Sequence, residues 1–399
     1  MILTPIITVP AGDQILRGSV HRDSTGRVYI PFTQSVGGGD TLLQLAYSDD
    51  EGDTWTIIEI TTTPAWVPGF NAAIDSLDRI HIVYTPPGIL NPANLQLAYR
   101  VFERTTGLSA EQLLTDDAFD RLIPSNQVLC VDSLDNLHLA YQSEPLGTFD
   151  RVMYRRTQAG VWQPEQTIVL NAGNVQELRG LAVGGSNVLH VVWTGFGWGA
   201  NPANENVQYM FNDGAWSARI PVTDNPVDFE GATSLALETN VVHFLLFVEA
   251  PITVSYRRYE PGLGLTVLEN IYNGAGNGPA YMGIDQLGEL HVLTSEETLT
   301  ELLSKYLKRS VPGVWQVPEV IFRGLPGPIG PVWYGAADPV LWPIAGNLRN
   351  NIPLSGYAAL VWDTAVNIFY FFRSDGLVLP TPPVIVGPSV ATLPATEVH

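Results

Sequence analysis

Five histidines recur at equivalent points along the chain, and histidine is a residue that binds metal ions and transfers protons. They are His81, His138, His190, His243 and His291. Each stands inside a short apolar run, which predicts a β-strand. Equivalent strands of successive repeats should lie roughly 10 Å apart, which is too far for their histidines to share one metal ion. We therefore predict no metal and no cofactor, and expect the histidines to form a repeated hydrogen bond between neighbouring sheets.

Other residue types that carry chemistry give weaker signals. The only cysteine, Cys130, lies in an apolar run, so no internal disulfide is possible and a small buried side chain is expected. The acidic segment with Asp116, Asp117 and Asp120 lacks the ligand spacing of a calcium-binding loop, and a solvated loop is expected. The sequence has no serine-nucleophile elbow, phosphate-binding loop or dinucleotide-binding fingerprint.

The elements that must position these residues come from a repeat. A short apolar run that ends in tyrosine and is followed by a polar turn recurs with a period of about 50 residues. The tyrosines are Tyr47, Tyr99, Tyr154, Tyr209, Tyr256, Tyr306 and Tyr370. One unit of this kind cannot bury its own apolar face, so successive units must pack on one another.

A second recurring sequence pattern places the histidines within each unit. It reads Asp-Ser-Leu-Asp-x-(Ile/Leu)-His-(Ile/Leu)-x-Tyr at residues 75–84 and 132–141, with looser copies around the other histidines. Each unit then contains an inner strand, a second strand with the histidine, a third strand that carries the repeated tyrosine, and a fourth strand after a turn with glycine. This pattern predicts an all-β fold, a seven-bladed β-propeller with four antiparallel strands per blade.

Closure of the ring depends on the two ends of the chain. The outer strand of the seventh blade could come from residues 377–386 or from residues 2–9. Three prolines in the first candidate, Pro380, Pro382 and Pro383, lack amide donors, so we expect the N-terminal strand to close the ring. The predicted division is a propeller over residues 1–376 and a Pro-rich extended tail over residues 377–399. Such a tail is rarely ordered unless it docks on another surface.

Ligand-binding residues are expected on one face of the propeller, where the loops that join strands two and three and strands four and one lie. Three of these loops carry a tryptophan: Trp66, Trp198 and Trp333. Trp198 is the best candidate, because its small neighbours leave the ring little to pack against. The other candidates are Asn201, Arg121, Arg151, Arg179 and Glu230, with Asp116, Asp117, Asp120, Asp150, Glu177 and Asp228 on the same face.

Exposed tryptophan among Asn, Asp and Arg side chains is typical of sugar binding or of a protein-binding hot spot. The alternative interpretation is that each tryptophan caps the core of its blade.

One segment resembles a known family. Residues 48–55 match the Ser-x-Asp-x-Gly-x-Thr-Trp pattern of the Asp-box, or BNR repeat, of sialidase-like propellers. The resemblance implies that Ser48, Asp50, Gly52 and Trp55 form a structural turn between the third and fourth strands, on the face away from an active site. The catalytic signature of sialidases is missing. The only Arg-Ile-Pro lies at residues 219–221, in the fourth unit instead of the first, and Arg17 in the first inner strand lacks the motif.

The amino-acid composition excludes some kinds of binding partner. A formal net charge of −20 argues against nucleic acid and anionic membranes as partners. No apolar stretch is long enough to insert into a membrane, and the N-terminus shows no signal peptide, which indicates synthesis in the cytoplasm.

These observations lead to a functional prediction. We predict a non-catalytic propeller that serves as a structural, receptor-binding or glycan-binding component of a larger assembly, such as a virion (phage) appendage or another extracellular assembly. It would dock on other protein subunits through its C-terminal tail. The alternatives are a stand-alone lectin-like carbohydrate-binding protein and a glycoside hydrolase of sialidase-like fold.

Overall fold

The computed structural model describes most of the chain up to residue 324 and three short segments beyond it. The described ranges are 2–10, 13–36, 40–50, 52–63, 69–86, 96–115, 127–143, 151–184, 187–199, 202–224, 230–238, 241–249, 252–273, 277–284, 289–297, 302–310, 313–324, 340–342, 358–363 and 368–373. In these ranges the backbone forms β-strands and turns without an α-helix. The strands make antiparallel sheets, so the predicted all-β class is confirmed.

Seven sheets follow one another along the described chain. The first contains β2 (Gln14–Gly18), β3 (His21–Arg22), β4 (Val28–Ser35), β5 (Thr41–Ser48) and β6 (Thr56–Thr63). The second contains β7 (Phe70–Ile74), β8 (Ile80–Tyr84), β9 (Ala98–Glu103), β10 (Gly107–Leu108) and β11 (Gln112–Leu113). The third contains β12 (Gln127–Val131), β13 (Leu137–Ser143), β14 (Arg151–Gln158), β15 (Val161–Trp162) and β16 (Gln166–Leu170).

The remaining sheets repeat this plan. The fourth contains β17 (Gln176–Val183), β18 (Leu189–Gly195), β19 (Asn206–Asn212) and β20 (Ile220–Pro221). The fifth contains β21 (Glu230–Glu238), β22 (Val241–Glu249), β23 (Ile252–Glu260), β24 (Gly264–Leu265) and β25 (Glu269–Asn273). The sixth contains β26 (Asn277–Ile284), β27 (Leu290–Glu297), β28 (Leu302–Ser310), β29 (Val314–Trp315) and β30 (Glu319–Gly324). The last contains β1 (Ile2–Thr8), β33 (Ile368–Arg373), β32 (Ala358–Asp363) and β31 (Val340–Trp342).

The outermost strand differs from the predicted single strand in four of these sheets. There two short pieces pair with the third strand on either side of a break, as β15 and β16 both pair with β14. In the third and sixth sheets the break contains a proline, Pro164 or Pro318, which has no amide hydrogen to donate.

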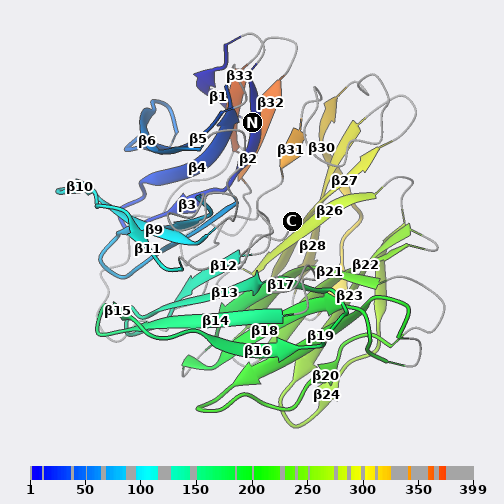
Figure 1. The fold of residues 1–399 in the computed structure, drawn as a ribbon. Helices are drawn as coiled ribbons and strands as arrows, with labels where there is room; N and C mark the ends of the chain where they lie inside the picture. The colour runs from blue at the N-terminus through cyan, green and yellow to red at the C-terminus, as the bar shows by residue number, and fades with distance from the viewer. Residues whose placement is uncertain are drawn as a thin grey trace.

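The apolar core lies between the sheets. Each buried cluster joins residues of two consecutive sheets, as Tyr29 and Leu43 of the first sheet pack with Phe70 and Ile82 of the second. Burial of each such side chain stabilises the fold by roughly 1.5–3 kcal/mol. The inner strands β7, β12, β17, β21 and β26 contact one another in succession. Figure 1 accordingly shows the sheets in chain order around a common centre.

The N-terminal strand completes the last sheet instead of the first. β1 pairs with β33 from Ile2↔Arg373 to Thr8↔Ile368. Ile6 and Val9 are buried in a cluster with Val20 and Val28 of the first sheet. The two ends of the described chain are therefore joined by backbone hydrogen bonds and by core packing (Figure 1).

Turns between the first and second strands link neighbouring sheets. Ser76 donates its amide and hydroxyl hydrogens to the two carboxylate oxygens of Asp135, at 2.9 and 2.6 Å. Ser24 donates to Asp78 in the same way. Asp78 and Asp135 have φ of 61° and 60°, a backbone conformation that Asp and Asn tolerate better than most residues. These turns thus tie the first sheet to the second and the second to the third.

The histidines make a different contact from the one expected. His81 Nδ1 lies 2.7 Å from the Tyr99 hydroxyl, and His138 Nδ1 lies 2.7 Å from that of Tyr154. Each pair joins the second and third strands of one sheet, so the expected hydrogen bond between sheets is wrong. The reason is register: His81 pairs with Val101 across the ladder, and the Tyr99 ring two residues away lies on the same face.

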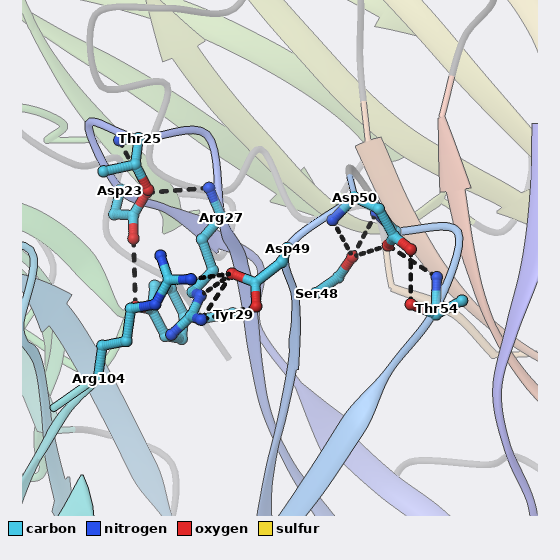
Figure 2. Close-up of polar contacts among 10 residues, drawn as sticks. Asp23, Thr25, Arg27, Tyr29, Ser48, Asp49, Asp50, Thr54 and Arg104 are labelled. Carbon is cyan, nitrogen blue, oxygen red and sulfur yellow. Dashed lines mark hydrogen bonds and ion pairs between the residues drawn. The ribbon is translucent and has the colours of Figure 1, made fainter. Parts of the chain in front are cut away.

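The segment with the Asp-box pattern forms a tight turn after β5 (Figure 2). Asp50 accepts hydrogen bonds from the amide and hydroxyl of Thr54 at 2.8 and 2.5 Å, and Ser48 Oγ accepts one from the amide of Gly52 at 2.7 Å. The two bonds from Thr54, with the hydroxyl's the larger effect, and one from the Ser48 hydroxyl lower the pKa of Asp50 to about 2. Gly52 has φ of 94°, a conformation that favours glycine. Trp55 packs on the core beneath the turn.

Candidate functional site

Several predicted ligand-binding residues lie at one edge of the third and fourth sheets. There Ser143 at the end of β13 pairs with Arg151 at the start of β14. Gly195 at the end of β18 pairs with both Gln176 and Asn206, at the starts of β17 and β19. We call this side of the sheets the loop edge. The turn that carries the Asp-box pattern lies at the opposite edge, because Ser48 is at the far end of β5.

Trp198 lies at the loop edge, between β18 and β19. Its neighbours Gly197 and Gly199 have φ of 80° and 79°, which glycine adopts without strain, so the loop turns sharply on both sides of the indole. A Cβ atom at Gly197 would collide with the side-chain amide of Asn171. The small residues around Trp198 are therefore required by the backbone path and by the close approach of amide side chains.

A buried glutamine anchors the indole. Trp198 Nε1 donates to Gln176 Oε1 at 2.5 Å, and Trp193 Nε1 donates to the same oxygen at 3.1 Å. Gln176 is fully buried, and its Nε2 donates to the Phe196 carbonyl at 2.9 Å. One amide side chain thus satisfies two indole N–H groups and a loop carbonyl.

An arginine covers one face of the Trp198 ring. The Arg219 guanidinium carbon lies 4.4 Å from the ring centroid, and Arg219 Nη1 donates to Gln208 Oε1 at 2.5 Å. Asn206 Nδ2 donates to the Trp198 carbonyl at 3.1 Å. Among the residues that the structure describes, no carboxylate lies within ion-pair distance of Arg219, although Asp224 is close enough to influence its charge. We call Trp198, Gln176, Asn206, Gln208 and Arg219 the Trp198 site.

The expectation that the Trp198 ring has little to pack against is wrong. The ring is half-buried and packs on the apolar cluster between the third and fourth sheets. The missing contacts come from residues far away in sequence, namely Gln176 and Arg219, which pairing of β17, β18, β19 and β20 brings to the loop. The Arg-Ile-Pro segment, set aside in the sequence because it lies in the wrong unit, supplies the arginine.

Some of the other candidate residues lie in the described ranges, and the rest lie outside them. Arg179 forms an ion pair with Glu177 on the inner strand β17, where a register shift lies between Leu178 and Gly180. Arg151 begins β14 and Glu230 begins β21, both at the loop edge. The predicted residues that lie outside the described ranges are Trp66, Trp333, Asn201, Arg121, Asp116, Asp117, Asp120, Asp150 and Asp228.

Two parts of the Trp198 site can meet a ligand: Arg219, which is exposed, and the half-buried indole. The three carboxamides are fully buried and hold these two groups in place, and an indole beside a guanidinium suits the apolar faces and hydroxyl pairs of sugars. Asn206 Oδ1 and Gln208 Nε2 are buried without a hydrogen-bond partner among the described residues. Within the same ranges, no group of three or more His, Cys, Asp or Glu could hold a metal ion, and no helix is long and apolar enough to cross a membrane.

Comparisons with known proteins identify the fold. No protein-family model matches the sequence, and no curated protein matches it. Among solved structures, an ulvan lyase of polysaccharide lyase family PL25 with a bound glycan fragment is similar over 99% of this chain and 93% of that chain, with a TM-score of 0.58 and 11% identity. A second ulvan lyase structure gives a TM-score of 0.58 at 10% identity, over 98% and 96% of the two chains.

A Hadza microbial sialidase is matched more weakly, with a TM-score of 0.47 and 12% identity over 91% of this chain and 66% of that chain. At 10–11% identity, the similarity to the two ulvan lyase structures concerns the fold alone, which is that of a β-propeller.

The comparison corrects the prediction that the protein is not an enzyme. That prediction rested on the missing catalytic signature of sialidases. The fold is shared over nearly the whole chain with a polysaccharide lyase, so the lack of one family's signature does not argue against catalysis. A docking role of the C-terminal tail and a virion location stay predictions, since residues 377–399 lie outside the described ranges.

Proposed function

We propose that this chain is a glycan-active protein that binds a polysaccharide at the loop edge of its sheets. The observation that carries the proposal is the Trp198 site, in which an accessible arginine lies on an indole among carboxamide side chains. Planar rings and fixed amide groups are the usual means by which proteins hold sugars. Similarity to a lyase solved with a bound glycan fragment supports the same reading at the level of the fold.

We further propose a seven-bladed propeller closed by the N-terminal strand. Seven antiparallel sheets in the described ranges, the pairing of β1 with β33, and the shared core of β1 and the first sheet support this ring. The bonds made by Ser48, Asp50 and Gly52 support kinship of the repeat with sialidase-like propellers. Docking of the tail on another subunit is a separate proposal.

Glycan binding can be tested with variants at the Trp198 site. We expect Trp198→Ala and Arg219→Gln each to weaken binding of the best ligand from a panel of neutral and acidic polysaccharides by about tenfold, since each removes a contact worth roughly 1–2 kcal/mol. Titration calorimetry measures the affinity, and circular dichroism checks the fold. Because Trp198 also packs on the core, Trp198→Phe separates packing from recognition.

The matched control is Trp162→Ala. Trp162 is also half-buried, but it packs on Tyr99 and pairs with Thr157 near the opposite edge, so its loss should leave binding unchanged. Binding that survives both Trp198→Ala and Arg219→Gln would place the glycan elsewhere. A wild-type protein that binds no polysaccharide of the panel would overturn the proposed function.

A further inference from the structure

A hydrogen bond between a tyrosine and a glutamate recurs in the second and third sheets. The buried tyrosine of the second strand donates its hydroxyl hydrogen to a glutamate before the outer strand, Tyr84 to Glu111 and Tyr141 to Glu165. Each of these tyrosines pairs across the ladder with the residue directly before the repeated tyrosine of the third strand. Each glutamate directly precedes the outer-strand residue that pairs with the repeated tyrosine. Register therefore defines both positions in every sheet that keeps this pairing.

The fourth sheet replaces both members of this pair. Trp193 stands at the position of the tyrosine, and Arg219 stands at the position of the glutamate. Trp193 donates to the buried Gln176, so it does not use an acceptor from the outer strand. In the fifth and sixth sheets a glutamate, Glu269 or Glu319, pairs with the repeated tyrosine itself, one position further on. The charge found at this point in four other sheets is thus reversed in the fourth sheet, beside Trp198.

The surroundings of Arg219 fix its orientation and leave donors free. Its guanidinium lies on the Trp198 ring, with 4.4 Å between the guanidinium carbon and the ring centroid, and Nη1 donates to the buried Gln208. A guanidinium has five N–H donors in one plane, so stacking on a ring leaves its donors at the edge of that plane. Arg219 is exposed, and only Nη1 has an acceptor among the described residues. The remaining donors can therefore meet a ligand.

The charge of Arg219 is not neutralised by an ion pair with any described residue. Arg79, by contrast, forms an ion pair with Asp75. Asp224 influences the charge of Arg219 but lies against the loop, where a Cβ atom at Gly199 would come within 2.4 Å of its Oδ1. Arginine stays protonated at neutral pH. The site therefore presents a positive charge on a chain whose formal net charge is −20.

We infer that Arg219 binds an anionic group of the glycan, a uronate carboxylate or a sulfate ester, an inference that rests on the proposed function. Two N–H donors of a guanidinium match two oxygens of such a group, and hydrogen bonds between charged partners are roughly twice as strong as neutral ones. The indole of Trp198 lies beside the bound anion, where it contacts the apolar part of the sugar. The protein as a whole repels polyanions, so its preference for an acidic glycan depends on this arginine.

The test uses two pairs of polysaccharides that differ in charge: a polyuronate with its carboxyl-reduced form, and a sulfated polysaccharide with its desulfated form. The wild-type protein should bind the acidic member of at least one pair about tenfold more tightly, as titration calorimetry at low ionic strength measures. A preference within the first pair alone assigns a carboxylate to Arg219, and a preference within the second pair alone assigns a sulfate ester.

The variants at Arg219 separate its charge from its shape. Arg219→Gln should weaken binding of the acidic member about tenfold and change that of the neutral member less than about twofold. Arg219→Lys keeps the charge without the planar fork and should retain part of the preference. Arg219→Glu introduces the residue found in other outer strands, so it should fold normally, and it should bind the neutral member better than the acidic one.

Arg156→Gln is the matched control, because it changes the net charge by the same amount. Arg156 is an exposed arginine on the third strand of the third sheet, and it pairs with His138 toward the edge opposite the Trp198 site. Its loss should leave both affinities unchanged. Equal wild-type affinity for the two members of both pairs, or a preference that survives Arg219→Gln, overturns the anion site and leaves the proposed function intact. A protein that binds none of the four polysaccharides overturns the anion site, whereas failure across the full panel overturns the proposed function.

Discussion

Each buried histidine of the second strands is held by a tyrosine, but the group on its other ring nitrogen varies. His81 Nε2 lies 3.0 Å from Asp75 Oδ2, and His138 Nε2 lies 3.2 Å from Asp132 Oδ2. An ionised carboxylate only accepts, so in these pairs Nε2–H donates to the aspartate. His190 has Gly184 at the equivalent position, and among the described residues it is hydrogen-bonded only to Tyr209. Burial without a carboxylate lowers the pKa of His190 to about 4.

This difference predicts a specific loss of stability in weak acid. The unfolded chain protonates His190 near its ordinary pKa of 6.5, whereas the folded chain resists protonation until about pH 4. Stability should therefore fall as pH decreases from about 6.5 to about 4, by up to roughly 3 kcal/mol. Burial also lowers the pKa of His243, so we expect His190→Gln to reduce this dependence, not to abolish it, in urea-unfolding curves measured at intervals across that range.

Asp132→Asn provides the contrast. Burial alone would raise the pKa of Asp132, but hydrogen bonds from His138 and Asn136 outweigh it and lower the pKa to about 2. Its stabilising contribution should persist to about pH 4 and disappear only as pH falls toward 2. An Asp132→Asn variant that lost the pH dependence between 6.5 and 4, or a His190→Gln variant that kept it undiminished, would contradict the assignment.

At the scale of the element, one motif in the turns between first and second strands both closes the turn and bonds to the neighbouring sheets. The first aspartate closes its own turn, as Asp75 accepts from the amides of Leu77 and Arg79. The serine and the second aspartate reach the neighbouring sheets. The third and fourth sheets are linked in the same way, because the Ser133 hydroxyl donates to Asn187 Oδ1 at 2.8 Å. An amide oxygen can therefore serve where a carboxylate does.

The use of Asn187 where other turns have an aspartate predicts how the link between sheets responds to mutation. Asp135→Asn should cost less than about 0.5 kcal/mol, because it keeps an acceptor and a residue that tolerates φ of 60°. Asp135→Ala should cost about 1–3 kcal/mol, since it removes both hydrogen bonds from Ser76 and adds backbone strain. Ser76→Ala, which leaves the backbone unstrained, should fall between them. Equal unfolding free energies for Asp135→Ala and Asp135→Asn would show that the link does not stabilise the fold.

The sequence predicts strands well here because strand pattern and turn residues are local and recur. The histidine strands and the turns at Asp75 and Asp132 lie where the repeat places them. Contacts that depend on register were harder to predict. The partner of His81 lies in its own sheet, and Arg219 reaches Trp198 only because β18, β19 and β20 pair side by side.

At the scale of the whole molecule, neighbouring sheets stabilise one another. Every buried cluster belongs to two consecutive sheets, so no sheet keeps its core alone. A ring has no free ends, whereas an open array leaves one exposed apolar face and one unpaired strand edge. If β1 closes the ring, its seven residues cover both the unpaired strand edge and the exposed apolar face. They do so through pairing with β33 and packing of Ile6 on the first sheet.

Deletion of residues 2–9 therefore should destabilise the entire molecule. We expect a lower melting temperature and a single transition, together with self-association in size-exclusion chromatography, because β33 then presents an unpaired edge. A synthetic peptide of residues 1–10 added in trans should restore the melting temperature as it rises in concentration. Deletion of residues 377–399 is the control and should leave melting unchanged. An N-terminal deletion that melts like the full-length chain would show that β1 pairs with β33 without closing the ring.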